Sequence, residues 1–287
     1  MKTKISKLDS KINEYAFLSS NSIKIIAIIT MFIDHLSKIV LQSWAVFGLS
    51  PKMEMNMLSQ EQYITINAFV KITLTNIGQI AFPLFCFLLV EGFHHTKNRK
   101  KYLSLMILFA LISEIPFDIA FFYIMSIRER TFPFNFNYQN VFFTLALGIL
   151  LMTTLERIEK KFPLAEKPKI SVVFQCISVG FIAIIADLIK ADYGSMGILF
   201  VFFLFTLKKS RLLQVISVLI VYMIYTGNIP SGFFLISSFA ILCYNGKRGN
   251  LNLKYFFYLF YPLHIILLFA SHLFLAYSLG YIDVVMS

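Results

Sequence analysis

Residues 21–44 read NSIKIIAIITMFIDHLSKIVLQSW, and this stretch decides the class of fold. A helix needs about 20 mostly apolar residues to cross a bilayer, and the stretch is long enough to do so. It nevertheless contains Lys24, Asp34, His35 and Lys38. A charged group inside a membrane span costs at least ~2.5 kcal/mol on insertion scales, so such residues indicate a site or a pathway.

Lys24 and His35 share one face of this predicted helix. Their separation of eleven residues is close to three whole turns at 3.6 residues per turn. Along the helix axis the two side chains are roughly 16 Å apart, about half the thickness of the hydrocarbon core. The spacing therefore predicts a cation near one membrane surface and an imidazole near the midplane.

The composition of the whole chain indicates an all-α, polytopic helical membrane protein. The chain has 287 residues, of which 58% are hydrophobic and 14% charged, whereas a soluble globular domain has about 25% charged residues. The net charge of +11 does not indicate nucleic acid, because the basic residues lie in short loops between apolar runs, where they set orientation. We expect a single integral-membrane domain over 1–287, with the lipid bilayer and no nucleic acid as a partner.

The three cysteines predict neither a metal site nor a disulfide framework. Cys86, Cys176 and Cys243 lie in or at the end of apolar runs far apart in sequence, and they fit no metal-ligand spacing. The N-terminus is polar up to Glu14 and the first apolar run is full length, so we expect no cleavable signal peptide.

Apolar runs and their breaks predict about nine transmembrane helices, with eight to ten as the range, around a polar central chamber. Residues 63–76 are interpreted as a separate helix at the interface or leading into the second span, with a short extended piece as the alternative. The turn signal at 227–230 separates the seventh and eighth spans. The predicted spans are 22–44, 77–93, 102–124, 138–155, 170–189, 193–207, 211–227, 230–245 and 255–277.

The loops carry very unequal numbers of basic residues. Nineteen lie before the first span or after the second, fourth, sixth and eighth, and four or five lie on the other side. By the positive-inside rule this asymmetry predicts a multi-pass protein of the cell membrane with a cytoplasmic N-terminus, an outside C-terminus and an odd number of spans. No internal repeat is apparent, which counts against a transporter built from duplicated halves.

Three polar residues are predicted near the midplane on three different helices: His35, Glu114 and His264. Burying them at one depth without partners is costly, so a shared polar chamber is the economical explanation. Asp118 lies one turn beyond Glu114 on the same face. Pro116 between them is expected to kink the helix and free a backbone carbonyl.

Other polar residues have purely structural interpretations. Asp34 can pair with Lys38 one turn on, and Lys24 can extend to the cytoplasmic surface. The remaining ones are expected to mark topology or to lie in solvated loops and at interfaces: Glu91, His94, His95, Asp187 and His272.

The order and sequence of several segments resemble the TraX family of membrane proteins. The most specific features are the Asp34-His35 pair, the Phe-Pro-Leu-Phe stretch in the second span and the Pro262-x-His264 motif. The resemblance covers residues 21 to about 268, nearly the whole chain. The matching segments are IKIIAIITMFIDHLSK (23–38), GQIAFPLFCFLLVEGFHHTKN (78–98), ISEIPFD (112–118), QNVFFTLALG (139–148), ADYGSMGIL (191–199) and YFFYLFYPLHIILL (255–268).

TraX proteins are in turn similar to a superfamily of transmembrane acyltransferases that includes the acyltransferase-3 proteins. The resemblance implies transfer of acetyl groups from cytosolic acetyl-CoA to acceptors on or across the membrane. Acyltransferase-3 proteins carry an Arg-x10-His pattern whose histidine is catalytic, and here Lys24 stands in place of that arginine, without its bidentate fork. Their later basic motif has no clear counterpart, although Lys97, Arg99 and Lys100 can serve.

The residue types suit acyl transfer from a thioester, which needs a base for the proton of the attacking amine or hydroxyl. We predict His35 as that base, since histidine titrates near neutral pH. Asp34 or Glu114 is expected to orient its ring or stabilise the imidazolium, and His264 is the second candidate for the base. Lys24 and the later basic cluster are expected to contact the CoA phosphates, and no metal is expected.

Several alternatives stay open at the level of sequence. Transfer can be direct or can pass through an acetyl-histidine. The acceptor can be a pilin or peptide amine, or a cell-surface glycan hydroxyl. In a different class, the midplane residues of a proton-coupled secondary transporter would form a proton relay. In a third, the polar residues of a structural membrane partner only fix helix packing.

Overall fold

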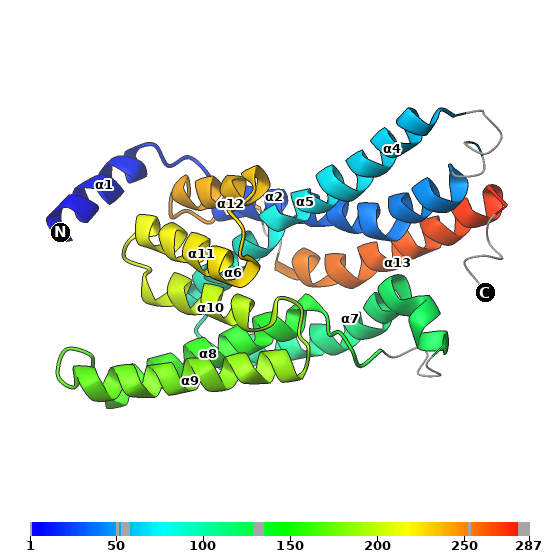
Figure 1. Cartoon of the computed structure of the whole chain (residues 1–287). Helices are drawn as coiled ribbons and strands as arrows, with labels where there is room; N and C mark the ends of the chain where they lie inside the picture. Colours follow the sequence, from blue (N-terminus) through cyan, green and yellow to red (C-terminus); the bar gives the residue numbers. More distant parts are fainter. Residues whose placement is uncertain (1, 50–51, 53–57, 129–134, 252–253, 281–287) are drawn as a thin grey trace. The chain divides into compact units, whose positions relative to one another are not determined.

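The structure is a computed structural model that describes residues 2–49, 52, 58–128, 135–251 and 254–280. Within these ranges the elements are helices joined by loops, and β-type pairing is limited to two isolated bridges. Figure 1 labels the helices, which belong to two compact units.

The first unit comprises Met1–Lys24, Pro83–Leu111 and Phe136–Asn250. Its centre is α10, which packs against α8, α9 and α11. Leu151 and Ile198 are fully buried there beside Leu155 and Ile182. The helices of this unit are α1 (Lys2–Glu14), α6 (Ala81–His95), the first part of α7 (Arg99–Arg128), α8 (Val141–Lys161), α9 (Pro168–Leu188), α10 (Gly194–Thr206), α11 (Arg211–Thr226) and α12 (Gly232–Leu242).

Short polar caps start several of these helices. The side chains of Asn140, Ser210 and Ser231 accept hydrogen bonds from backbone N–H groups in the first turns of α8, α11 and α12, which satisfies donors that a helix start leaves unpaired. Helix α11 ends at Gly227, whose φ of 66° is left-handed, a conformation that glycine adopts at low cost. The turn predicted at 227–230 is thereby confirmed.

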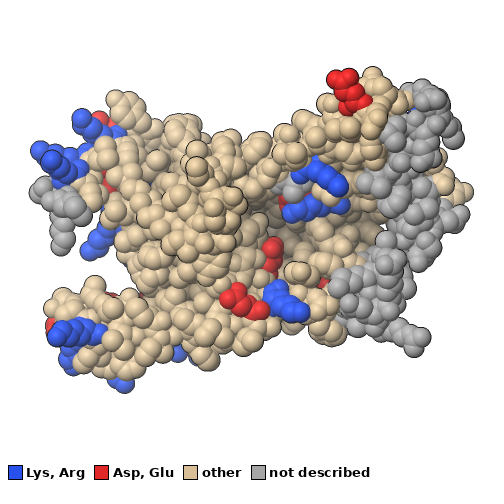
Figure 2. Space-filling view, in the orientation of Figure 1, with Lys and Arg blue, Asp and Glu red and all other residues tan. Residues whose placement is uncertain are grey.

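The basic loops of the first unit meet at one end. Arg211 donates to the Asn13 Oδ1 at 2.7 Å, which joins α1 to α11, and Arg99 pairs with Glu156 at 3.4 Å, which joins α7 to α8. Figure 2 shows Lys and Arg side chains gathered over α1 and over the α8–α9 turn. At the other end the backbone of Gln139 pairs with the α9–α10 loop. The side of the membrane on which these loops lie stays a prediction.

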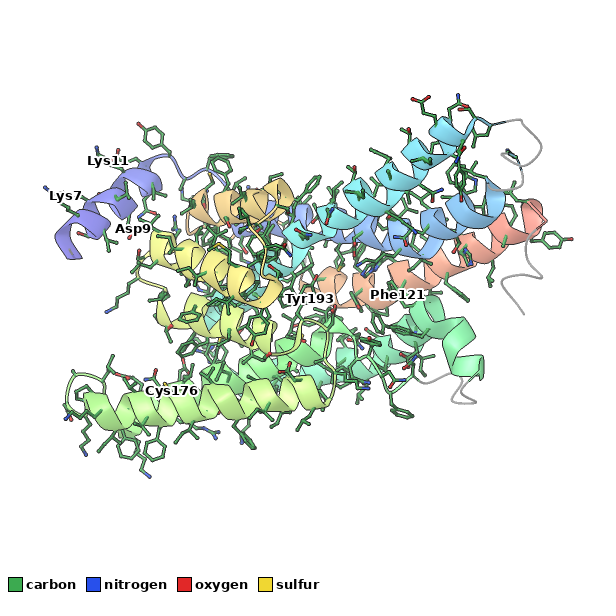
Figure 3. All side chains as sticks on the ribbon, in the orientation of Figure 1. Lys7, Asp9, Lys11, Phe121, Cys176 and Tyr193 are labelled. Carbon is green, nitrogen blue, oxygen red and sulfur yellow. The ribbon has the colours of Figure 1, made fainter. Side chains whose placement is uncertain are left out.

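Five helical segments are long and apolar enough to cross a membrane, among the residues that the structure describes. Helix α9 exposes large apolar side chains along its length, such as Ile177 (61%) and Phe181 (64%), as a lipid-facing helix does. Figure 3 labels Cys176 on this helix. Helices α10, α11 and α12 have 13, 16 and 11 residues. The chain is thus a multi-pass helical protein, and nine spans stay a prediction. The five segments are Gln60–His95, Arg99–Phe122, Val141–Lys161, Pro168–Leu188 and Phe256–Ser278.

The second unit comprises Ile25–Phe82, Ile112–Asn135 and Leu251–Ser287. Helix α13 packs against the two π-helical turns that continue α2, and the first of these turns also contacts the π-helical turn η3. Its elements are most of α2 (Ser20–Leu36), η1 (Ser37–Leu41), η2 (Trp44–Gly48), α4 (Gln60–Ala68), η3 (Phe69–Leu74), α5 (Thr75–Ile77), η4 (Gly78–Ile80), the second part of α7, and α13 (Lys254–Ser278).

Two local expectations are tested in this unit. Residues 63–76 are helical and lead into the second predicted span, as one of the interpretations had it, because the chain is helical from Gln60 through His95. They form neither a separate helix nor an extended piece. Helix α7 continues through Pro116, and its non-helical backbone lies at Phe122 (φ −129°, ψ 17°). A proline removes one helical hydrogen bond without always bending the helix at its own position.

Candidate active site

The candidate active site is a pair of histidines in the second unit. His35 lies one residue before the end of α2, and His264 lies in α13 two residues after Pro262. The His35 Nδ1 and the His264 Nε2 are 2.7 Å apart. The two rings are nearly parallel, with an interplanar angle of 7° and centroids 5.0 Å apart. The structure therefore joins the two histidines that the sequence predicted at similar depth.

A backbone carbonyl fixes the direction of the hydrogen bond between the rings. The His264 Nδ1 is 2.7 Å from the Phe260 carbonyl oxygen, and because a carbonyl only accepts, this nitrogen carries the hydrogen. With both rings neutral, the His264 Nε2 is then an acceptor, and the His35 Nδ1 must donate to it. The Nε2 of His35 is left with its lone pair, so this atom is the one that can take a proton.

Aromatic rings surround the pair. Phe121 of α7, labelled in Figure 3, and Tyr261 of α13 both meet the His35 ring edge-on, with centroids at 5.3 and 5.9 Å. The Phe32 ring lies 6.2 Å from that of His264. An apolar environment of this kind keeps water away and strengthens the electrostatic interactions inside it.

Asp34 is buried next to the pair and bonded to a lysine. Its Oδ2 accepts from the Lys38 Nζ at 2.8 Å and lies 4.0 Å from the His35 Nε2. A Cβ on Gly78 would come within 2.5 Å of the Asp34 Cγ, so the absence of a side chain at residue 78 makes room for the carboxylate. The pairing of Asp34 with Lys38 that the sequence suggested is present, and the hydrogen bond that orients His35 comes from His264.

Two π-helical turns support this arrangement. Ser37 in η1 donates its hydroxyl to the Val70 carbonyl in η3 at 2.9 Å, and Ser37 is fully buried. A π-helical turn leaves backbone groups out of the regular i to i+4 pattern and is frequent at functional sites. The bond ties the end of the His35 helix to the run that carries Gly78.

The acidic residues of α7 lie in the same unit. Glu114 is half-buried and Asp118 is 1% exposed. The Asp118 Oδ2 accepts from the Asn135 backbone N–H at 2.7 Å. Their spacing on the helix is the one expected, and the role of Glu114 in orienting an imidazole stays a prediction.

The residues predicted to contact the donor belong to the first unit. Lys24 lies half-buried in the first turns of α2. Arg99 is engaged by its ion pair with Glu156 and by a hydrogen bond to a backbone carbonyl of the α6–α7 turn. Lys97 and Lys100 are exposed. Their contact with CoA stays a prediction.

One further histidine differs from expectation. His94 is not in a solvated loop, because α6 extends to His95 and the His94 ring stacks on Phe205 with centroids 5.3 Å apart. His272 is 6% exposed, and its place at the membrane interface stays a prediction. The position of His94 one turn after Glu91, at the end of an unbroken apolar run, was the available signal that the helix continues.

These features define a class: a multi-pass helical membrane protein with a hydrogen-bonded histidine pair among aromatic rings. The family model described as TraX protein matches residues 19–271. The chain therefore belongs to the TraX family, as the motifs around the two histidines indicated.

A named relative comes from a bacterium. The chain is 32% identical over 217 residues to the probable fimbrial assembly protein FimC, serogroup H1, of Dichelobacter nodosus. The match covers 69% of this chain and 82% of that protein. No solved structure matches the chain.

Proposed function

We propose that this protein is a membrane-embedded acetyltransferase that moves an acetyl group from cytosolic acetyl-CoA to an acceptor on or across the cell membrane. The observation that carries the proposal is the bond between the His35 Nδ1 and the His264 Nε2. It leaves the His35 Nε2 as a free base in an apolar site, as proton abstraction requires. Membership in the TraX family supports the same reading.

The reaction needs one proton transfer and one exchange of bonds. The His35 Nε2 takes the proton of the acceptor amine or hydroxyl as its nitrogen or oxygen attacks the thioester carbonyl. The new C–N or C–O bond forms, the C–S bond breaks, and the imidazolium returns its proton to the leaving thiolate. His264 holds the ring in the active tautomer throughout, since its own Nδ1–H is held by the Phe260 carbonyl. A route through an acetyl-histidine uses the same nitrogen as nucleophile.

The donor is proposed to enter from the cytoplasmic side. Basic residues gather at the end of the first unit that holds α1 and the loops after α6, α8 and α10, and the positive-inside rule places that end in the cytoplasm. Lys24 lies three helical turns before His35 in α2, a span of roughly 16 Å. An extended pantetheine arm is of this order of length. Nine spans with a cytoplasmic N-terminus and an outside C-terminus are part of the proposal.

The acceptor class is suggested by the relative, which is named a probable fimbrial assembly protein. We propose an amine of a pilus subunit or peptide as the first acceptor to test, with a cell-surface glycan hydroxyl as the second. Both carry a proton that a neutral imidazole can accept while the acyl group transfers.

The test is release of free CoA from acetyl-CoA by protein purified in detergent or liposomes. The parent protein should release CoA faster when a pilin peptide with a free N-terminus is added. His35→Ala should abolish measurable turnover, because loss of a general base costs a factor of ~10²–10⁴, while CoA binding and Tm are retained. His95→Ala is the matched control, since the His95 side chain is 77% exposed, and it should keep normal turnover.

Equal turnover by the parent and the His35→Ala variant would refute the enzyme proposal. In that case proton-coupled uptake by the same proteoliposomes becomes the next measurement, because a proton relay is the remaining use of the buried pair.

A further inference from the structure

An aromatic cluster with two cations lies at the cytoplasmic end proposed for the first unit. Phe93 and His94 lie in the last turn of α6, and Phe205 lies in the last turn of α10. The Phe205 ring is 5.8 Å from Phe93 and stacks on His94 at 5.3 Å, centroid to centroid. The Arg99 Cζ lies 3.9 Å from the Phe93 centroid, and the Lys208 Nζ lies 5.9 Å from the Phe205 centroid. Three elements thus bring an imidazole, an ammonium and a guanidinium to one small surface.

Some polar groups of this cluster lack a hydrogen-bond or ion-pair partner in the described part of the chain. The His94 Nε2 is buried and has no hydrogen-bond partner within the described part of the chain, and a buried polar atom without a partner calls for an explanation such as a missing ligand. Arg99 already bonds Glu156. Lys208 is exposed and pairs with no carboxylate in the described ranges. The cluster therefore has an imidazole nitrogen that can donate when it carries the hydrogen, and an ammonium that pairs with no carboxylate in the described ranges, since Glu156 pairs with Arg99.

We propose that His94 and Lys208, backed by Arg99, bind a phosphate group, and that its source is acetyl-CoA; the second part rests on the proposed function. A phosphate brings several acceptor oxygens, which can receive the His94 Nε2–H and the Lys208 ammonium together. The stacked rings hold both donors in place, so little side-chain freedom is lost on binding. Lys97 and Lys100, which the sequence predicted for contact with CoA, are exposed.

Calorimetric titration of the purified protein tests the site, in a detergent that has no phosphate. CoA and 3′,5′-ADP are the phosphate-bearing probes, and pantetheine is the probe without phosphate. Lys208→Gln removes the charge, and His94→Phe keeps the ring stack while removing the N–H. Each variant should weaken the binding of CoA and of 3′,5′-ADP about tenfold or more, because each removes one charge-assisted hydrogen bond to the phosphate. Pantetheine binding should not change.

Lys209→Gln is the matched control. It removes the same charge from the adjacent exposed residue, and CoA affinity should stay within about twofold. Equal losses in the Lys208→Gln and Lys209→Gln variants would show a diffuse charge effect and overturn the site. So would unchanged affinity in Lys208→Gln and His94→Phe, and the acetyltransferase proposal would then stand if CoA release still depends on His35.

Another result would support the phosphate site and refute the acetyltransferase proposal. If the parent binds 3′,5′-ADP through Lys208 but releases no CoA from acetyl-CoA, the phosphate site stands and the acetyltransferase fails. Nanodiscs with phosphatidylglycerol or with phosphatidylcholine alone distinguish the source of the phosphate. Displacement of bound 3′,5′-ADP by phosphatidylglycerol would assign the site to a lipid headgroup and overturn acetyl-CoA as its source.

Discussion

Replacing His264 by phenylalanine isolates the hydrogen bond that sets the tautomer of His35. The variant keeps an aromatic ring of similar size between Phe260, which stacks on His264 at 4.6 Å, and His35. It removes the acceptor for the His35 Nδ1–H, in a site where the His35 side chain is 12% exposed. His35 must then keep a buried unpaired N–H or move its hydrogen to Nε2, which destroys the base.

The expected loss follows from the cost of that unpaired group. A buried donor without a partner costs ~1–3 kcal/mol, and each 1.36 kcal/mol corresponds to about tenfold in rate. The kcat for acetyl transfer should therefore fall about 5- to 150-fold in His264→Phe. This is a smaller loss than the ~10²–10⁴ expected for removing the base itself with His35→Ala. CoA affinity should be unchanged, since neither nitrogen of His264 is proposed to contact the donor.

The assay is the initial rate of thiol release from acetyl-CoA at saturating acceptor, with CoA binding and Tm measured on each variant. Because the two histidines act as one unit, the double variant should be as slow as His35→Ala and no slower. Parent-like turnover in His264→Phe would refute the tautomer argument. A double variant whose loss is the product of the two single losses would show that His264 acts independently of His35.

Three further predictions concern packing and topology. Gly78→Ala should destabilise the protein by about 1–3 kcal/mol, because the new methyl group meets Asp34. The control is Gly180→Ala, where a Cβ meets nothing within 4 Å, and it should leave Tm unchanged or higher. Equal Tm losses in the two variants would refute the packing argument. The Tyr244 hydroxyl donates to the Glu91 Oε2 at 3.0 Å, so Tyr244→Phe removes this bond and should cost ~1–3 kcal/mol; an unchanged Tm contradicts this. A single cysteine placed in the α8–α9 turn should resist an impermeant thiol reagent in intact cells, and rapid labelling would reverse the proposed orientation.

The sequence predicted most helices well because their ends carry local signals. Asn140 and Ser231 are caps whose side chains bond the first turns of their helices, and Gly227 ends α11 at a positive φ. These signals depend on a few neighbouring residues, so they can be interpreted without knowledge of the packing. The pairing of Asp34 with Lys38 is predictable for the same reason, since residues one turn apart are neighbours on any helix.

The features that the sequence did not predict depend on distant contacts or on backbone detail. The π-helical turn at 69–74 has no distinctive residue pattern, and the alternation of apolar residues with Thr and Asn over 63–76 resembles an interfacial or extended piece. The predicted depth in the membrane placed His35 and His264 at one level. Depth alone does not determine which nitrogen of one ring forms a hydrogen bond with which nitrogen of the other. That required the Phe260 carbonyl, which lies one turn before His264 in α13.

The π-helical turn η3 makes the length of the chain at 69–74 part of the site. A π-helical turn holds one residue more than an α-helical turn, so deleting one residue from η3 would let this turn close as an ordinary α-helix. The deletion would shift the Val70 carbonyl, which accepts from the Ser37 hydroxyl. A one-residue deletion between 69 and 74 is therefore expected to weaken the link between the end of the His35 helix and the helical run that carries Gly78, although it removes no side chain of the histidine pair.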